Sequence, residues 1–394
     1  MQDSHSTFVR CYFLCPYLRI KHLKTIKGKY AEARIFTDES DEYAEAQVRL
    51  ICDSVAADGS SVCVMPDLHP GKVGPIGLAM TVTDKIIPQL IGVDIGCGVT
   101  CVRLNKSKVE FQKLDRIIRE NIPSGFDIRK NVHHRADEFQ FEELYCLKNI
   151  NRDKAEKSLG TLGGGNHFIE IDRSADGTLY LTVHSGSRHT GEEVAEHYTK
   201  RASIELKEAG LDIPYYQSWL SGRSADEYIH DVRIMQKYAE LNRDIIISEI
   251  LKGMKLKAEE KFSVPHNYID DAGILHKGSI SARKGEKVII PVNMRDGVIL
   301  GMGKGNEEWN CSAPHGSGRI IKRSEVKNAH TVSEFRKAMN GIYSSCLAAD
   351  TLDEAPFAYR SIDEIAARIH ATVEITDILT PVYSYKAGSG KKVK

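Results

Sequence analysis

The sequence lacks any apolar run long enough for a membrane-spanning helix, which needs about 20 consecutive apolar residues. It also lacks an excess of charge of either sign, because lysine plus arginine and aspartate plus glutamate each number 54. This balance gives no overall attraction to a polyanion, so a nucleic-acid partner would have to be held by a local basic patch. We therefore expect no membrane partner, and we look for function in local motifs.

Three further patterns are missing. No Gly-x-x-x-x-Gly-Lys-Ser/Thr loop occurs, which excludes an ordinary Walker-type nucleoside triphosphatase. The nine cysteines are odd in number and irregularly spaced, and they match neither a disulfide framework nor the short Cys-x-x-Cys zinc patterns. The apolar patch at 11–18 is interrupted by Pro16 and flanked by arginines, unlike a secretory signal. These absences favour a cytoplasmic protein with reduced thiols.

The chain is long enough for one large domain or two to three smaller ones, and 41% of its 394 residues are hydrophobic. No internal repeat, low-complexity block or linker rich in Pro, Gly and Ser divides it. We expect an α/β fold with mixed sheets, built as a single large domain with helical insertions, and candidate site groups on loops at strand ends.

Hydrophobic periodicity predicts interleaved helices and strands. The predicted helices span 38–56, 108–121, 191–209, 224–251, 332–347 and 361–371. The predicted strands span 61–65, 76–83, 99–102, 179–183, 261–264, 288–292 and 382–385, and a glycine loop at 159–171 runs into another. The strand at 61–65 is expected to end at a turn rich in Pro and Gly. The polar segment 124–140 is either a mobile basic segment or a solvated loop.

A glycine-punctuated strand end at 91–98 presents Asp94 and Cys97 three residues apart. Carboxylate and thiolate are both anionic metal ligands, and glycine lets the backbone bend closely around an ion. The alternative is that Cys97 is a small buried apolar residue and that Asp94 caps a turn.

Four histidines stand in a similar setting, after an apolar strand and within a turn rich in Gly, Asn or Ser. They are His167, His184, His266 and His315. One such histidine is more often a turn or core residue than a ligand, but four of them beside a carboxylate and a thiol are harder to dismiss. Active sites of α/β proteins collect on loops at strand ends. The set could hold two divalent ions with a bridging thiolate, and ligand softness favours zinc.

Two glycine-rich loops, at 163–165 and 316–318, expose backbone N–H groups of the kind that cradle phosphate. Lys72, Arg188 and Arg319 lie within a few residues of the candidate site groups and would suit a phosphate-rich substrate. Each of these cations is equally well explained as a surface charge or as the partner of a carboxylate.

Together these segments resemble the RtcB family of RNA ligases. The matching stretches are VMPDLHPGKVGPIG (64–77), IGVDIGCG (91–98), LGTLGGGNHFIEI (159–171), HSGSRHTG (184–191), HNYI (266–269), KGSISARKGE (277–286), GKGNEEWNCSAPHGSGR (303–319) and YKAG (385–388). The series in this order is specific to that family. The resemblance implies a ligase domain at 24–388, an extension of uncertain order at 1–23 and a basic tail at 389–394.

The resemblance implies a GTP-dependent ligase that joins an RNA 3′-phosphate or 2′,3′-cyclic phosphate to a 5′-hydroxyl. His315 would be the nucleophile and would form a covalent histidine–GMP intermediate, from which GMP passes to the RNA 3′ end. Family members use two manganese ions, which replaces the zinc expected from ligand softness. The implied partners are RNAs with broken ends, tRNA or rRNA, with an activating or repair-pathway protein as a further partner.

The resemblance also assigns roles to individual residues. The implied metal ligands are Asp94, Cys97, His167, His184 and His266, with Cys97 shared between the two ions. The implied nucleotide contacts are Asn166, His315, Gly318 and Lys386. The implied substrate contacts are Asp67, His69, Arg188 and Arg319, of which Asp67 and His69 could instead support other site groups.

The chain departs from the family pattern at three places. Where the family has Gly-Ser-Met-Gly, residues 292–295 are Val-Asn-Met-Arg, which raises the question of nucleotide choice. The loop before His315 is Cys-Ser-Ala-Pro, and a basic tail follows Lys386. These changes indicate a divergent paralogue, and repair of RNA cut by a ribotoxin is one hypothesis for it. The competing hypotheses are a ligation-deficient metal- and nucleotide-binding module and a metallophosphoesterase that processes RNA ends.

Overall fold

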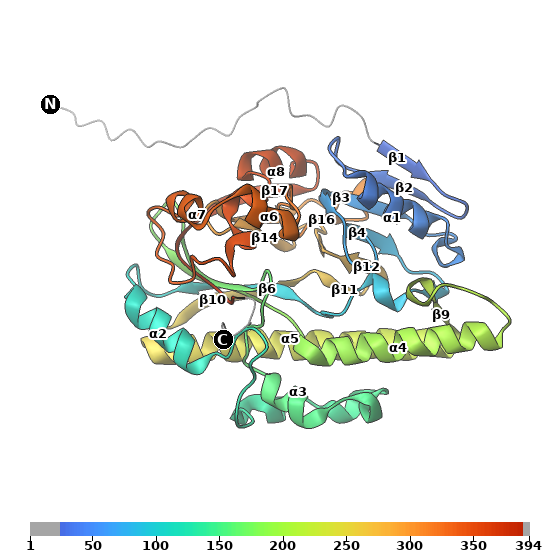
Figure 1. Ribbon diagram of the computed structural model, residues 1–394, viewed down its shortest axis with the longest axis horizontal. Helices are drawn as coiled ribbons and strands as arrows, with labels where there is room; N and C mark the ends of the chain where they lie inside the picture. Colours follow the sequence, from blue (N-terminus) through green and yellow to red (C-terminus); the bar gives the residue numbers. More distant parts are fainter. Residues whose placement is uncertain (1–23, 389–394) are drawn as a thin grey trace.

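The computed structural model describes residues 24–388, and both the predicted extension at 1–23 and the predicted tail at 389–394 lie outside this range (Figure 1). The α-helices are α1 (Glu42–Cys52), α2 (Phe111–Asn121), α3 (Arg152–Ser158), α4 (Arg188–Glu208), α5 (Gly222–Met254), α6 (Arg323–Ala329), α7 (Val332–Ala338) and α8 (Ile362–Ile369). The first nine strands are β1 (Lys24–Lys27), β2 (Glu32–Ile35), β3 (Val62–His69), β4 (Ile76–Thr81), β5 (Lys85–Ile86), β6 (Gly98–Leu104), β7 (Phe168–Arg173), β8 (Leu179–Ser185) and β9 (Leu220–Ser221). They are followed by β10 (Ala258–Pro265), β11 (Asn267–Ile269), β12 (Ile274–Lys277), β13 (Ser279–Ser281), β14 (Lys287–Asn293), β15 (Gly297–Gly303), β16 (Ser312–Pro314) and β17 (Val373–Lys386).

The larger sheet has the strand order β10-β6-β8-β7-β17-β15-β14, with antiparallel neighbours throughout. Its long strand β17 belongs to two parts of the sheet. Residues 373–379 of β17 pair with β15, and residues 380–386 pair with β7. β17 therefore connects the four-stranded part β10-β6-β8-β7 to the β14-β15 hairpin.

The second sheet has the order β1-β2-β3-β4-β12-β11, and only β2 and β3 in it are parallel. Helix α1 packs on this sheet through its buried apolar stripe of Ala44, Val48 and Ile51. β11 follows β10 after a single residue, His266. That residue thus lies where the two sheets meet.

Helix α5 is 33 residues long and packs against β8 and β11, so it contacts both sheets (Figure 1). Its Arg243 is 2% exposed and donates to the carbonyl oxygens of Gly96 and Ser185, at 3.0 and 2.9 Å. These bonds hold the backbone at Gly96, just before β6, and at Ser185, the last residue of β8. Neither α5 nor any other helix within residues 24–388 combines the length and apolar composition that a membrane crossing requires.

The structure confirms the predicted mixed α/β fold class and corrects several boundaries. The predicted helix at 332–347 is wrong beyond residue 338: α7 ends there, and Gly341 adopts φ 89°, which a continuing helix does not allow. Strand β3 does not stop at residue 65 but continues to His69, because a register shift between Val64 and His69 accommodates Pro66. In the polar segment 124–140, Arg129 donates to the carbonyls of residues 159 and 160, so this segment is attached to the fold.

Candidate active site

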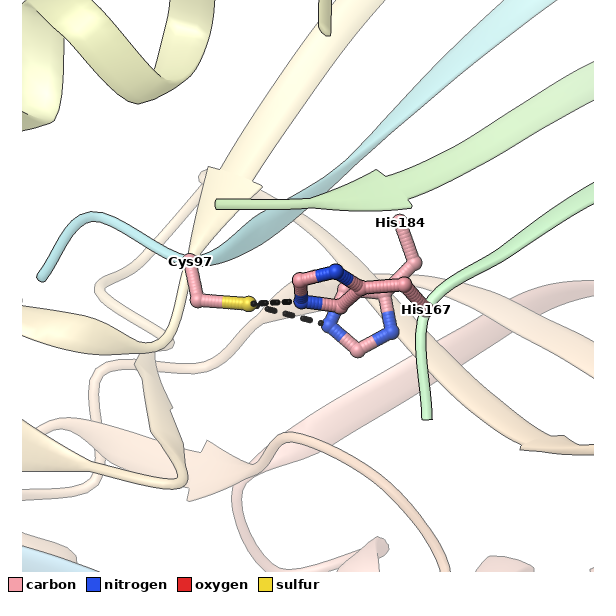
Figure 2. Close-up of side chains that lie close together, drawn as sticks. All are labelled: Cys97, His167 and His184. Carbon is pink, nitrogen blue, oxygen red and sulfur yellow. Dashed lines mark hydrogen bonds between the residues drawn. The ribbon is translucent and has the colours of Figure 1, made fainter. Parts of the chain in front are cut away.

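Four of the predicted site residues lie at one edge of the four-stranded part of the larger sheet. Cys97 directly precedes β6, His167 directly precedes β7, His184 is the last but one residue of β8, and His266 directly follows β10. Antiparallel pairing places Val99 opposite His184 and Gly98 opposite Pro265, which brings these ends together. Figure 2 shows the thiol of Cys97 facing two of the imidazoles.

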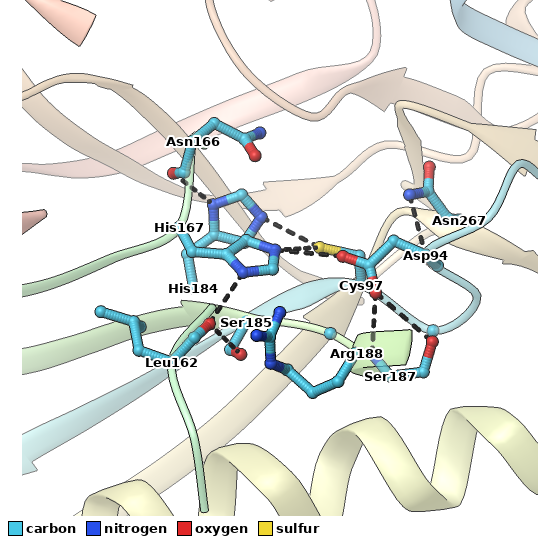
Figure 3. Close-up of polar contacts among 12 residues, drawn as sticks. Asp94, Cys97, Leu162, Asn166, His167, His184, Ser185, Ser187, Arg188 and Asn267 are labelled. Carbon is cyan, nitrogen blue, oxygen red and sulfur yellow. Dashed lines mark hydrogen bonds and ion pairs between the residues drawn. The ribbon is translucent and has the colours of Figure 1, made fainter. Parts of the chain in front are cut away.

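Asp94, Cys97 and His167 form one group of donor atoms. The Nε2 atom of His167 lies 3.0 Å from Oδ2 of Asp94 and 3.4 Å from Sγ of Cys97 (Figure 3). The other carboxylate oxygen of Asp94, Oδ1, accepts from the backbone N–H of Ser187 at 2.8 Å, and this bond holds the carboxylate in place. A Cβ atom at Gly186 would come within 2.2 Å of that oxygen, so a side chain at residue 186 would displace the carboxylate.

Cys97, His184 and His266 form a second group, which shares the thiol with the first. The Sγ atom of Cys97 lies 3.2 Å from Nε2 of His184, and this nitrogen lies 3.3 Å from Nε2 of His266. The three side chains are almost completely buried. The thiol of Cys97 is thus within reach of both donor groups.

Hydrogen bonds on the far side of two rings determine which nitrogens face the cluster. Nδ1–H of His167 donates to the carbonyl of Leu162 at 2.8 Å, and Nδ1–H of His184 donates to the carbonyl of Asn166 at 3.2 Å. The Nε2 lone pairs therefore point inward. Burial, together with neighbouring positive charge, lowers the pKa of His184 and of His266 well below the usual value, so both rings are neutral ligands at pH 7.

These groups fit cations. A carboxylate oxygen, imidazole lone pairs and a sulfur converge within hydrogen-bond distance of one another, an arrangement of acceptors that an ion between them would satisfy. Burial and the charge of Asp94 raise the pKa of the Cys97 thiol well above its usual value, so an arriving ion must displace a proton from it. These residues could therefore hold a metal ion, and its binding would release a proton.

His315 lies beside the second group, with its ring centre 4.8 Å from that of His266. Its Nδ1 lies 2.7 Å from Oδ2 of Asp67, a carboxylate with no exposed surface. A carboxylate oxygen at this distance accepts the Nδ1–H, and this tautomer carries its lone pair on Nε2. No residue within 24–388 hydrogen-bonds this Nε2. His315 is thus set up as a nucleophile or base through Nε2.

A pocket opens in front of His315. Its polar lining includes His69, Asn166, Glu170, Ser317, Arg319, Arg323, Tyr359 and Lys386, and its apolar lining includes Phe168, Val292 and Met294. Gly316 and Gly318 of the predicted phosphate loop line it as well. The lining thus combines several cations with the carboxylate of Glu170, which lies on β7 near Lys386 of the paired strand β17, and this combination suits a nucleotide.

The remaining predicted residues divide between the pocket and its surroundings. Gly318 and His69 line the pocket, whereas Asp67 lies behind His315. Arg188 does not line it: its guanidinium donates to the hydroxyl of Thr161 and to the carbonyl of Gly125. Burial lowers the pKa of His69 to about 4, so its ring is neutral.

The substituted loop at 292–295 does reach the pocket, but only in part. Val292, Asn293 and Met294 line it, whereas Arg295 pairs with Asp296 at 2.7 Å and is not part of the lining. The additional cation that the sequence places in this loop therefore does not face the nucleotide pocket.

Two acidic residues at or next to the pocket, Glu170 and Glu354, are not among the predicted site residues. Glu170 lies three residues after His167 on β7, and alternation along this strand was the available signal that its side chain faces the site. Glu354 lies in a turn at 352–354 and contacts Lys386, Arg319 and Arg323. No local pattern predicts those contacts, because they depend on how distant segments meet.

Comparison with known proteins agrees with this geometry. The family model described as tRNA-splicing ligase RtcB matches residues 54–387. The RNA-splicing ligase RtcB of Escherichia coli strain K12 is 29% identical over 372 residues, covering 82% of this chain and 90% of that protein. The tRNA-splicing ligase RtcB of Aeropyrum pernix is 27% identical over 409 residues, covering 78% and 84%. That of Methanococcus maripaludis is 26% identical over 399 residues, covering 78% and 83%.

Proposed function

The chain belongs to the RtcB family, and from that premise we propose that it is a GTP-dependent RNA ligase acting on 3′-phosphate or 2′,3′-cyclic phosphate and 5′-hydroxyl ends. The observation that carries the proposal is the position of His315. Its Nδ1 is bound by a buried carboxylate, and its ring lies against a cluster of candidate metal donors at the edge of a pocket lined by several cations.

In the proposed first step, Nε2 of His315 attacks the α-phosphorus of GTP. A P–N bond forms, the bond from the α-phosphorus to the bridging oxygen breaks, and pyrophosphate leaves. The ring becomes positively charged as it attacks, and the carboxylate of Asp67 at 2.7 Å stabilises that charge. The GMP then passes to the RNA 3′-phosphate, and the 5′-hydroxyl attacks the activated end with release of GMP.

We propose manganese as the metal, in two ions. Asp94, Cys97 and His167 would hold one ion, and Cys97, His184 and His266 the other, as the two donor groups allow. Bound there, the ions would neutralise phosphate charge as the reaction proceeds. The thiolate and imidazole donors would also accept zinc, so metal identity is part of the test.

The lining of the pocket favours a nucleotide whose base is guanine and whose phosphates lie near the glycine-rich loop at 316–318. Glu170 accepts from Ser384 at 2.7 Å and faces the pocket, where a carboxylate matches the N1–H and N2–H groups of guanine. Lys386 would contact the acceptor edge of the base. Asn166 and Gly318 would contact the phosphates, and Arg319 would bind phosphate through its NH1 group, which is buried without a protein partner.

The proposed substrates are broken tRNA or rRNA, and the proposed ligase domain spans 24–388. His69 lies at the pocket and would contact the RNA end. For Arg188 to hold a substrate phosphate, it would have to exchange its present bonds to Thr161 and Gly125. We also propose that the protein acts in the cytoplasm, with an activating protein partner, in the repair of RNA cut by a ribotoxin. Experiments in cells test these three parts of the proposal.

The decisive experiment is mass spectrometry of the intact protein after incubation with Mn²⁺ and GTP. We expect a GMP adduct that is labile in acid and stable in alkali, and no adduct on the His315→Ala variant with its metal still bound. Loss of the RNA end phosphate without GTP would instead indicate the metallophosphoesterase. Absence of both adduct and end processing, with metal bound, would indicate the ligation-deficient module.

A further inference from the structure

One buried carboxylate lies behind the cation-rich wall of the pocket. Glu354 is 3% exposed and is not part of the pocket lining. Its Oε2 accepts from Lys386 Nζ at 2.9 Å and from the Tyr359 hydroxyl at 2.6 Å, and its Oε1 accepts from Arg319 at 2.7 Å and from Arg323. All four partners line the pocket. One side chain outside the pocket thus holds four that face it.

The charges around Glu354 are strongly unbalanced. Three cations meet this one carboxylate, and Asp353 contributes a second acidic side chain only to Arg323, at 2.6 Å. Burial alone would raise the pKa of Glu354, but the charges of Lys386, Arg323 and Arg319 lower it, so the group is ionised at neutral pH. An ionised, fully bonded carboxylate is a rigid anchor for its partners.

Lys386 shows what this anchoring achieves. Its ammonium group has three N–H donors. One donates to Glu354, a second is 3.4 Å from the carbonyl oxygen of Asn166, and the group lies 5.4 Å from the centre of the Phe168 ring. Lys386 lines the pocket, so the third donor is left for a ligand. With two donors engaged by fixed acceptors, the direction of the third is determined.

We propose that Glu354 is a positioning residue that sets base selection, by holding Lys386 so that its remaining N–H meets an acceptor on the purine. Guanine offers O6 and N7 as acceptors on this edge, whereas adenine replaces O6 with an N6 amino donor. A fixed ammonium donor therefore favours guanine, and a mobile one discriminates less. This inference rests on the proposed function, since it presupposes that the pocket takes a purine nucleoside triphosphate.

The test compares Glu354→Gln with the wild-type full-length chain, both loaded with Mn²⁺. The amide keeps the size of the side chain and removes its charge, so the hold on Lys386 weakens. The rate of nucleotide transfer to the protein is measured against GTP and against ATP, and each is resolved into a maximal rate and a half-saturating concentration. We expect the preference for GTP over ATP to fall about tenfold, mainly through a higher half-saturating concentration for GTP.

Asp353→Asn is the matched control. It removes the charge of the neighbouring acidic residue, which pairs with Arg323 but not with Lys386, and its carbonyl bond to Arg319 remains. We expect its preference for GTP to stay within about twofold of wild type. Glu354→Asp retains the charge on a shorter side chain and is expected to restore part of the preference. Thermal unfolding and bound manganese are measured for every variant, and Glu354→Asp carries the test if Glu354→Gln fails to fold.

The possible outcomes separate the two proposals. If the wild type forms no GMP adduct, the proposed function fails. In a second outcome, the wild type forms the adduct, but the Glu354 variants alter the rate of transfer from GTP and from ATP by the same factor, or alter only the maximal rate. This outcome overturns the role of Glu354 in base selection. A reduced preference for GTP in Glu354→Gln, with manganese unchanged and Asp353→Asn close to wild type, supports it.

Discussion

The two sides of the site present opposite chemistry to the same pocket. On the side of β6, β7, β8 and β10, the inward atoms are imidazole nitrogens, a thiol and one carboxylate. On the other side, Arg319, Arg323 and Lys386 surround a single carboxylate. The first arrangement attracts cations and the second attracts anions. A metal-assisted reaction on a nucleotide needs both within reach of one nucleophile.

The difference extends to how each side is built. We call the first the metal side, because it carries the candidate metal donors. It is held by backbone geometry, since paired strands bring its strand ends together and Gly186 leaves room for Asp94. We call the second, with Arg319, Arg323 and Lys386, the nucleotide side. It is held by side chains, with Glu354 at its centre. We therefore expect substitutions on the metal side to abolish function and those on the nucleotide side to change rate, pH response and selectivity.

The largest effect should come from Cys97→Ala, because the sulfur is the one donor that the two metal groups share. We expect loss of both ions and a fall in ligation of about a thousandfold or more, as several kcal/mol of charge stabilisation are lost. Elemental analysis of the purified protein and a ligation assay measure the two quantities.

The control for this variant is Cys101→Ala, which removes a buried thiol from β6, the strand that Cys97 directly precedes, and lies outside the donor groups. It should retain its metal. A Cys97→Ala protein that still binds two ions would show that the thiol of Cys97 is not a shared metal donor.

A smaller loss, of about a hundredfold, is expected for Asp67→Asn in the rate of GMP transfer to His315. The amide can donate to Nδ1 and so favour the wrong tautomer, and it cannot stabilise the positive ring. Metal content should not change, since Asp67 contacts His315 and not the donor groups. Rapid-quench measurement of the adduct gives the rate, and Asp84→Asn, an exposed acidic residue, serves as the control. An unchanged rate would remove Asp67 from the mechanism.

The smallest effect should depend on pH and concerns Glu170→Gln. Burial raises the pKa of Glu170 to about 7, so its side chain is a neutral acid below that pH and an accepting carboxylate above it. Glutamine resembles the neutral acid. We expect wild type and variant to use GTP about equally near pH 6 and to differ by several-fold near pH 8, with wild type faster. A constant ratio across this range would exclude contact between the Glu170 carboxylate and the base.

The same contrast explains what could be predicted from the sequence. Asp94, Cys97 and the four histidines stand at strand ends, in turns rich in Gly, Asn or Ser, so local pattern could predict a candidate metal site beside the alternative of ordinary turn and core residues. The fold class followed from the alternation of strands and helices, and the error at 332–347 arose because a helical apolar pattern continued past Gly341.

The nucleotide side could not be predicted in this way. Glu354 is 32 residues from Lys386 in the chain, and only the packing of the turn at 352–354 against β17 brings them together. The long-range assembly of side chains leaves no periodic signal in the sequence. The resemblance named Asp67 as a site residue, but its contact with His315 and the roles of Glu170 and Glu354 had to come from the structure.

The pairing of β17 also bears on the order of events in folding. The strands next to the candidate metal donors end by residue 265, whereas the strand that connects them to the β14-β15 hairpin spans Val373–Lys386. Contacts between residues far apart in the chain form slowly, because closing the long loop between them costs entropy before the contacts can form. We therefore expect the pairing of β17 with β7, and with it the placement of Lys386 at the pocket, to be among the late steps of folding.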